Sequence, residues 1–175
     1  MRKCSGKSTK HSIKSCCPVF NTNRMVLEYA EVSYLPSFGR EAKLSANDYA
    51  LARQLAEWRR KIRDQWHAVR VEHVQAPPIE SLRVGDHLTV QATVNLGSLA
   101  LNEVVVQLFH GVIDSFGEIA NPKTTVLQPT GTGNPTVFHG TIECAASGQY
   151  GFSVRVLPNH PALAHLYESG LVTWG

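Results

Sequence analysis

Apolar residues in the first third of the chain recur at helical spacing. Within residues 18–36 they follow one another at steps of three and four positions: Met25, Val26, Tyr29, and then Val32 or Ser33. Asn21 and Thr22 precede this pattern and are good N-cap residues, because a short side-chain oxygen accepts from the free N–H groups of the first turn. Pro36 is expected to end the helix. The stretch therefore predicts a short amphipathic helix with one buried face.

A second apolar stripe predicts a longer helix. Its members step by four, three, four and four: Leu51, Leu55, Trp58, Ile62 and Trp66. A loop is expected at residues 37–40, and Ser45-x-x-Asp48 is a weak helix-starting arrangement. Arginines lie on the other faces of this helix, which could suggest a surface for nucleic acid or sugar. Because both tryptophans share the apolar stripe, a core or docking contact is favoured.

From Val69 onward the period changes from helical to two. Residues 86–94 alternate apolar and polar, and residues 104–110 have the β-branched composition of a central strand. Further strands are expected at 123–127, 136–143, 148–157 and 171–174, with a loop at 129–135.

These patterns predict an α+β chain. A basic, poorly ordered segment (1–17), helical only near Ile13, precedes a helical arm of two amphipathic helices (18–68). An immunoglobulin-like antiparallel β-sandwich follows (69–175).

Composition and charge narrow the function classes. Hydrophobic residues make up 43% of the 175 residues, and no apolar run approaches a membrane span. No secretory signal is recognisable, so we expect a cytoplasmic protein whose four cysteines are reduced thiols. The net charge of +3 conceals a basic start, since residues 1–24 carry six basic and no acidic side chains. Nucleic-acid binding by this segment remains an alternative, but the weaker one.

No catalytic or metal-binding constellation is recognisable. The eight histidines form no HxxxH or HExxH pattern, the cysteines form no CxxC pair, and no G-x-S-x-G elbow is present. His110 and His139 precede glycines in candidate strands and could face each other, but structural histidines are favoured. Surface aromatic rings are the remaining candidates, because sugar-binding sandwiches stack pyranose rings on them. Trp174 and Tyr167 are the rings we expect to be exposed.

The predicted first helix also carries a family resemblance. Phe20, Asn21, Thr22, Arg24, Met25, Val26, Glu28 and Tyr29, followed by Tyr34, Leu35 and Pro36, resemble the last helix of the α-glucan (glycogen/maltodextrin) phosphorylases. Residues 12–15 resemble the approach to that helix. Residues 150–158 and 170–174 resemble the C-terminal extension of a long bacterial subfamily. The likeness runs from about residue 12 to the end and covers only the tail of a much larger enzyme.

This resemblance implies a parent reaction, the phosphorolysis of α-1,4-glucan to glucose 1-phosphate with pyridoxal phosphate. In that family a lysine after a Ser-Gly-Thr-Gly-Asn run holds the cofactor as a Schiff base. Here residues 131–134 read Gly-Thr-Gly-Asn, but Pro135 and Thr136 follow and no lysine does, so we interpret the match as coincidence. We expect no cofactor, metal or catalytic residue in this chain, and a docking role against the phosphorylase catalytic body. A carbohydrate-binding module that contacts α-glucan is the alternative.

Overall fold

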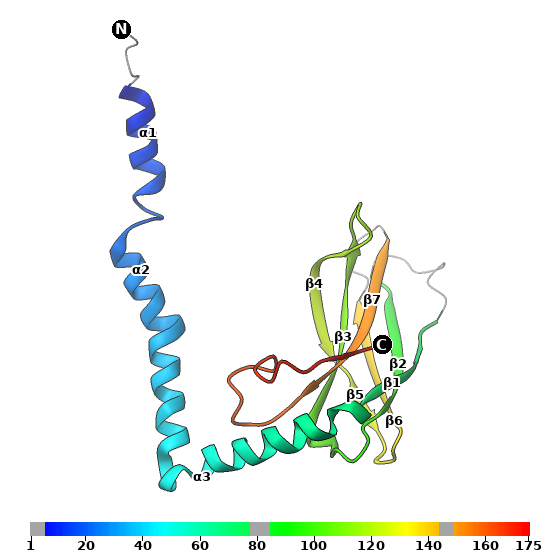
Figure 1. Ribbon diagram of the computed structural model, residues 1–175. Helices are drawn as coiled ribbons and strands as arrows, with labels where there is room; N and C mark the ends of the chain where they lie inside the picture. The colour runs from blue at the N-terminus through cyan, green and yellow to red at the C-terminus, as the bar shows by residue number, and fades with distance from the viewer. Residues whose placement is uncertain (1–5, 78–84, 144–148) are drawn as a thin grey trace. The chain divides into compact units, whose positions relative to one another are not determined.

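The computed structural model describes residues 6–77, 85–143 and 149–175 of the chain (Figure 1). The chain forms two compact units, Met1–Ala52 and Arg53–Gly175. They are called the N-terminal unit and the C-terminal unit below, and each is described by itself. The boundary falls inside the range 18–68 that was expected to form one arm, because residues 53–68 pack with the sandwich that follows them.

The N-terminal unit begins with two helices, α1 (Gly6–Cys16) and α2 (Thr22–Tyr29). Helix was expected only near Ile13 in this part of the chain, whereas α1 begins at Gly6. The predicted N-cap of the next helix is confirmed. The Asn21 side chain accepts a hydrogen bond from the backbone N–H of Arg24 at 2.8 Å, which satisfies one free donor of the first turn.

The helical backbone continues through Pro36, where a stop was expected. A π-helix, η1 (Ala30–Tyr34), follows α2, and α3 (Leu35–Gln65) begins directly after it. Pro36 is therefore the second residue of α3. Its missing N–H and its ring would disturb a regular α-helix, and the widened π-turn immediately before it changes the hydrogen-bonding pattern at that point. The loop expected at residues 37–40 is likewise helical.

The interruption lies about ten residues further along. Inside α3 the backbone leaves the helical region from Ala46 to Tyr49, and the last three of these residues have φ values of 52°, 53° and 59°. Asn47 and Asp48 tolerate this left-handed conformation better than most residues do. The break coincides with the predicted start signal at Ser45-x-x-Asp48, so the sequence did mark this position.

Apolar side chains of the N-terminal unit are exposed rather than buried. Neither α2 nor η1 has a buried residue, and Val32 is 76% exposed. The predicted buried face is therefore wrong for this chain alone. The amphipathic pattern is present, but nothing among the described residues covers its apolar side.

The C-terminal unit begins with residues 53–65 of α3, where the predicted apolar stripe is buried. Leu55, Trp58, Ile62 and Trp66 all lie in the core, and Ile62 is only 1% exposed. The interpretation of both tryptophans as core residues is confirmed. The short 3₁₀-helix η2 (Trp66–Ala68) then leads into the first strand.

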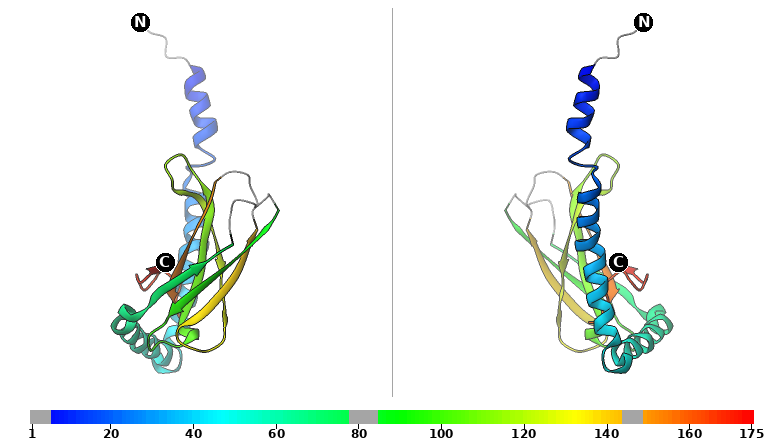
Figure 2. Two further views of the ribbon diagram at one scale, coloured as in Figure 1. Left: turned by 90° about the vertical axis from the view of Figure 1, so that its right-hand side faces the viewer. Right: turned by 90° about the vertical axis from the view of Figure 1, so that its left-hand side faces the viewer.

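Two four-stranded antiparallel sheets follow, and they form separate layers (Figure 2). In one sheet the order is β1, β2, β6, β5, and in the other it is β4, β3, β7, β8. The strands are β1 (Arg70–Gln75), β2 (His87–Asn95), β3 (Val104–Ile113), β4 (Ile119–Val126), β5 (Gln128–Thr130), β6 (Thr136–Glu143), β7 (Tyr150–Pro158) and β8 (Thr173–Trp174). The predicted α+β class with an antiparallel sandwich is confirmed. Part of the expected 129–135 loop is the short strand β5.

The core lies between the sheets and is built from alternating positions. Leu88, Val90, Ala92 and Val94 of β2 are all buried, as the alternation predicted. The chain crosses from one sheet to the other at Leu127, whose N–H donates to the Val106 carbonyl at 2.9 Å. Gly140 of β6 leaves the space that the Leu127 side chain occupies, because a Cβ there would collide with Leu127 Cδ2.

Within the described parts of the chain, no helix combines the length and the apolar character needed to cross a membrane.

The buried stripe of α3 makes a stability prediction. Replacing Ile62 by alanine should lower the free energy of unfolding by about 2–5 kcal/mol, because it removes a fully buried side chain and leaves a cavity. The control Val172→Ala changes an exposed residue of the same unit and should cost less than about 0.5 kcal/mol. Urea denaturation followed by circular dichroism measures both. Equal effects of the two variants would contradict the packing described.

His110 makes a pH prediction. Its ring nitrogens bond the Tyr150 hydroxyl at 2.8 Å and the Thr125 hydroxyl at 3.1 Å. Burial lowers the pKa of the His110 imidazole, and the Lys123 ammonium lowers this pKa further. The folded state thus binds this proton less readily than the unfolded state does. For this reason the free energy of unfolding is undiminished by His110 above about pH 6.5, and it decreases as the pH falls below that value.

The variant His110→Gln should therefore lose less stability than the wild type between pH 7 and pH 5, as measured by urea denaturation at each pH. His139→Gln, which changes an exposed histidine, should keep the wild-type slope. Parallel slopes for the wild type and His110→Gln would refute this role of His110.

Candidate functional site

Three aromatic rings surround one buried arginine on the outer face of the β3–β7–β8 sheet. Arg155 of β7 is directly opposite Gln107 of β3 and Trp174 of β8, so the three side chains lie on the same face. Phe109, two residues after Gln107, shares this face, and Tyr167 reaches it from the segment that follows β7. The guanidinium carbon lies 5.1 Å from the Phe109 ring centroid, 5.2 Å from that of Tyr167 and 5.6 Å from that of Trp174.

Hydrogen bonds fix the guanidinium among these rings. Nε of Arg155 donates to Oε1 of Gln107 at 3.0 Å, and Nη2 donates to the Tyr167 hydroxyl at 2.6 Å. The rings of Phe109 and Trp174 meet edge to face, with centroids 5.6 Å apart and an interplanar angle of 87°. The rings are therefore held in defined positions by the cation and by one another.

Among the described residues, the charge of Arg155 has no acidic partner. The residue is only 6% exposed, yet among the described residues no carboxylate lies within ion-pairing distance of it. A buried charge without a counter-ion is costly unless other groups compensate for the lost water. Here the compensation comes from two hydrogen bonds and the electron-rich faces of the rings.

Both residues singled out for carbohydrate contact belong to this arrangement. Trp174 is 50% exposed and Tyr167 is 55% exposed, so each presents part of its ring to solvent. Phe116, by contrast, is 89% exposed in the turn between β3 and β4 and is not part of this arrangement. Arg155, Phe109 and Gln107 were missed by the sequence reasoning. The available signal was Arg155 itself, a single charge inside the otherwise apolar stretch 150–158.

The segment that carries Tyr167 is fastened to α3. One carboxylate oxygen of Glu168 pairs with Arg59, and the other accepts a hydrogen bond from the Ala164 backbone N–H at 2.6 Å. The rings of Trp58 and His160 lie 4.9 Å apart. These contacts hold residues 159–171 against the helix and so determine where Tyr167 is placed.

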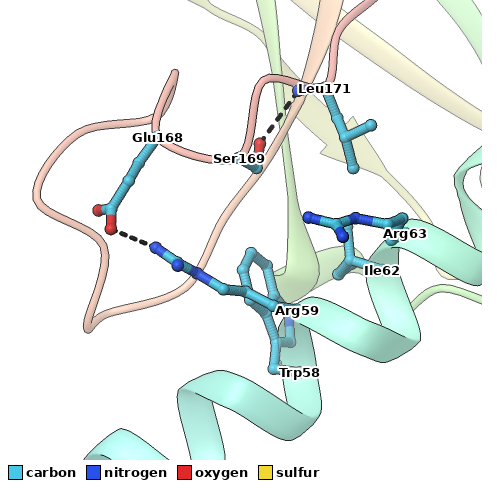
Figure 3. A pocket seen from close by; sticks show the side chains of 7 residues that line it. All are labelled: Trp58, Arg59, Ile62, Arg63, Glu168, Ser169 and Leu171. Carbon is cyan, nitrogen blue, oxygen red and sulfur yellow. Dashed lines mark hydrogen bonds and ion pairs between the residues drawn. The ribbon is translucent and has the colours of Figure 1, made fainter.

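A small pocket lies at this contact (Figure 3). Its lining residues come from α3 and from the segment after β7: Trp58, Arg59, Ile62, Arg63, Glu168, Ser169 and Leu171. Figure 3 shows Arg59 extending across the Trp58 ring to Glu168, while Arg63 reaches toward Ser169 and Leu171. Since Glu168 is engaged by Arg59 and by the Ala164 N–H, it is a structural ion-pair partner rather than a free acid or base.

The glycine-rich run has a structural role at the end of the sandwich. Oδ1 of Asn134 accepts from the Leu96 N–H at 3.0 Å, and Nδ2 donates to the Gly97 carbonyl at 2.8 Å. These bonds tie the loop before β6 to the turn after β2. The run is thus part of a loop between strands, as the sequence analysis interpreted it.

The histidines and cysteines singled out earlier are dispersed. His110 and His139 lie in different sheets, so they do not face each other as the sequence analysis allowed; His139 bonds the Thr130 hydroxyl at 2.8 Å. Cys16 and Cys17 are free thiols, whereas Cys4 and Cys144 lie outside the described residues. In the described ranges no group of three histidine, cysteine or acidic side chains could hold a metal ion.

Comparison with known proteins agrees with the resemblance seen in the sequence. Residues 66–175 match the family described as the glycogen phosphorylase C-terminal domain. The chain is 34% identical over 167 residues to a glycogen phosphorylase of Mycobacterium bovis and 33% identical to one of Mycobacterium tuberculosis. It is 28% identical over 170 residues to a maltodextrin phosphorylase of Thermococcus litoralis.

These matches cover 94% of this chain but only 19% of each mycobacterial relative and 20% of the Thermococcus relative. The chain therefore spans about a fifth of the length of the curated relatives it matches. The matched length exceeds residues 66–175, so the similarity extends into the helices that precede the C-terminal domain. On this evidence the chain belongs to the glycogen phosphorylase family, of which residues 66–175 represent the C-terminal domain.

Proposed function

We propose that this chain serves as the C-terminal part of an α-glucan phosphorylase and does not catalyse the reaction alone. The complete enzyme would act in the cytoplasm and cleave α-1,4-glucan with phosphate to give glucose 1-phosphate. Family membership supports this proposal, as does the fraction of the relatives' length that the chain covers. The observation that carries it is the exposed apolar surface of the N-terminal unit.

The residues present do not fit pyridoxal phosphate, the cofactor of the parent reaction. A Schiff-base site needs a lysine amine in a protected pocket. The Gly-Thr-Gly-Asn run is followed by Pro135, and its Asn134 side chain is occupied by backbone bonds to the neighbouring turn. Lys61, on the helix of the C-terminal unit, bonds both carboxylate oxygens of Glu103 at 2.7 Å. We therefore assign the cofactor and the chemistry to the remaining four fifths of such an enzyme.

The purified chain should release no glucose 1-phosphate from maltoheptaose, phosphate and added pyridoxal phosphate. The reason is that the residues for cofactor attachment are missing from it. An enzyme-coupled assay for glucose 1-phosphate makes the measurement, with the complete M. tuberculosis glycogen phosphorylase as a positive control. Phosphate-dependent release of glucose 1-phosphate by the chain itself would refute the proposal.

The surface proposed for docking consists of large apolar side chains of the N-terminal unit. So many exposed large apolar side chains within residues 13–49 exceed what scattered surface residues show, and exposed apolar surface of this extent typically marks an interaction site. The exposed residues are Ile13, Val19, Phe20, Met25, Val26, Leu27, Tyr29, Val32, Tyr34, Leu35, Phe38 and Tyr49. They lie on α1, on α2, on η1, on the first part of α3 and in the connection between α1 and α2.

The partner we propose for this surface is the catalytic body of the phosphorylase. Two observations support that choice. The similarity to complete phosphorylases includes the helices that carry these side chains, and about four fifths of each relative's length lies outside the stretch that this chain matches. A helix that keeps an amphipathic pattern while its apolar side is uncovered is expected where another part of the same enzyme completes the core.

Docking can be tested with M. tuberculosis glycogen phosphorylase shortened by the stretch that this chain matches. The chain should bind it, and Val32→Asp or Phe38→Asp should weaken binding at least about tenfold, because each places a charge in an apolar contact. Both side chains are exposed in the free chain, so its fold should be preserved. Isothermal titration calorimetry measures the affinity.

Phe116→Asp is the matched control, since it changes a phenylalanine of the C-terminal unit that is 89% exposed, against 71% for Phe38. It should bind as the wild type does. Absence of wild-type binding, or equal weakening by all three variants, would exclude the N-terminal unit as the docking surface.

A further inference from the structure

The Arg155 cluster points to a binding site in the C-terminal unit. We infer that the exposed parts of Tyr167 and Trp174, positioned by Arg155, bind an α-glucan chain. The choice of α-glucan as the sugar rests on the proposed function; the inference that these rings bind carbohydrate rests on their own geometry. Phe109 and Gln107 complete the site from beneath, and neither needs to touch the ligand.

The two rings are ordered before any ligand arrives. Tyr167 is held through its hydroxyl, which accepts from Nη2 of Arg155, and Trp174 is held by its place in β8 and by its edge-to-face contact with Phe109. The guanidinium contacts both rings, at 5.2 and 5.6 Å from their centroids. A ligand that lands on them does not have to order the side chains first, which removes an entropic cost of binding.

The chemistry of the surface suits a neutral sugar. A pyranose ring has an apolar face of C–H groups and a rim of hydroxyls, which match an aromatic face with polar groups beside it. The polar group here is the Tyr167 hydroxyl, which accepts from Arg155 and still has its own proton to donate. Because both rings contact the same guanidinium, one oligosaccharide can reach both.

An acidic ligand is the less suitable occupant. It would need to reach a guanidinium that is 6% exposed and whose Nε and Nη2 already donate to Gln107 and Tyr167. What the surface offers outward is ring area rather than charge.

Native gel electrophoresis of the full chain, in gels with and without glycogen, tests the inference. Glycogen should retard the wild-type chain, and Trp174→Ala and Tyr167→Ala should each raise the apparent dissociation constant at least about tenfold. Phe116→Ala removes an exposed ring elsewhere in the unit and should leave retardation unchanged. Arg155→Lys keeps the charge but loses the planar fork, so it should weaken retardation although no ligand contact is removed. Circular dichroism shows whether each variant is folded.

Several outcomes would overturn the inference. They are an unretarded wild-type chain, equal loss in Phe116→Ala, or retention of wild-type affinity by folded Trp174→Ala and Tyr167→Ala. Retardation by dextran sulfate but not by glycogen would assign the surface to an acidic partner and also overturn it. The result is separable from the docking proposal, because Trp174→Ala should still bind the shortened phosphorylase while Val32→Asp should still be retarded by glycogen.

Discussion

The burial of apolar surface divides this chain into two different kinds of structure. In the C-terminal unit the stripe of α3 and the inward faces of both sheets are covered, and aliphatic side chains such as Ile62, Leu88 and Leu108 are fully buried. In the N-terminal unit the same kind of amphipathic pattern leaves its apolar residues in contact with solvent. Since burial of apolar surface is the main favourable term in folding, the C-terminal unit has a core of its own, whereas the described side chains of the N-terminal unit form none.

The contrast also explains the two kinds of interaction proposed for the chain. A surface rich in aliphatic and aromatic side chains along helices suits a permanent contact that completes a core. Two half-exposed rings held by a buried cation suit a small ligand, because their positions are already fixed. The apolar surface lies in helices that the much longer relatives also contain. The two rings lie in the matched C-terminal domain. Under the two proposals, one chain would both attach to the phosphorylase catalytic body and contact an α-glucan.

Much of the fold was predictable because local patterns and tertiary structure agree. Strand β6 has the predicted bounds, and the alternating positions of β2 face the core, since period-two patterning leaves only one face to bury. The helix end predicted at Pro36 is wrong, because the local sequence does not indicate the π-turn after which the helix continues. The buried face predicted for α2 shows that a pattern reports which side is apolar, but not whether anything covers it.

The candidate site was less predictable than the fold. Trp174 and Tyr167 could be named as rings near the chain end, but their meeting at Arg155 depends on strand register and on the path of residues 159–171 along α3. The register places Trp174 opposite Arg155, and the Arg59–Glu168 ion pair helps to fix the segment that carries Tyr167. Neither feature is encoded in local sequence spacing. The one indication in the sequence was Arg155, a charged residue inside an apolar strand, and its role becomes apparent only from the residues that contact it.

Amide hydrogen exchange tests the central claim most directly, because it reports whether the uncovered helices of the N-terminal unit become part of a larger core. The chain is labelled alone and with M. tuberculosis glycogen phosphorylase that lacks the matching stretch. The account predicts slower exchange in residues 22–34 on mixing, while exchange in β2 and β6 stays unchanged. Unaltered exchange in residues 22–34 at a saturating concentration of the shortened enzyme would contradict it.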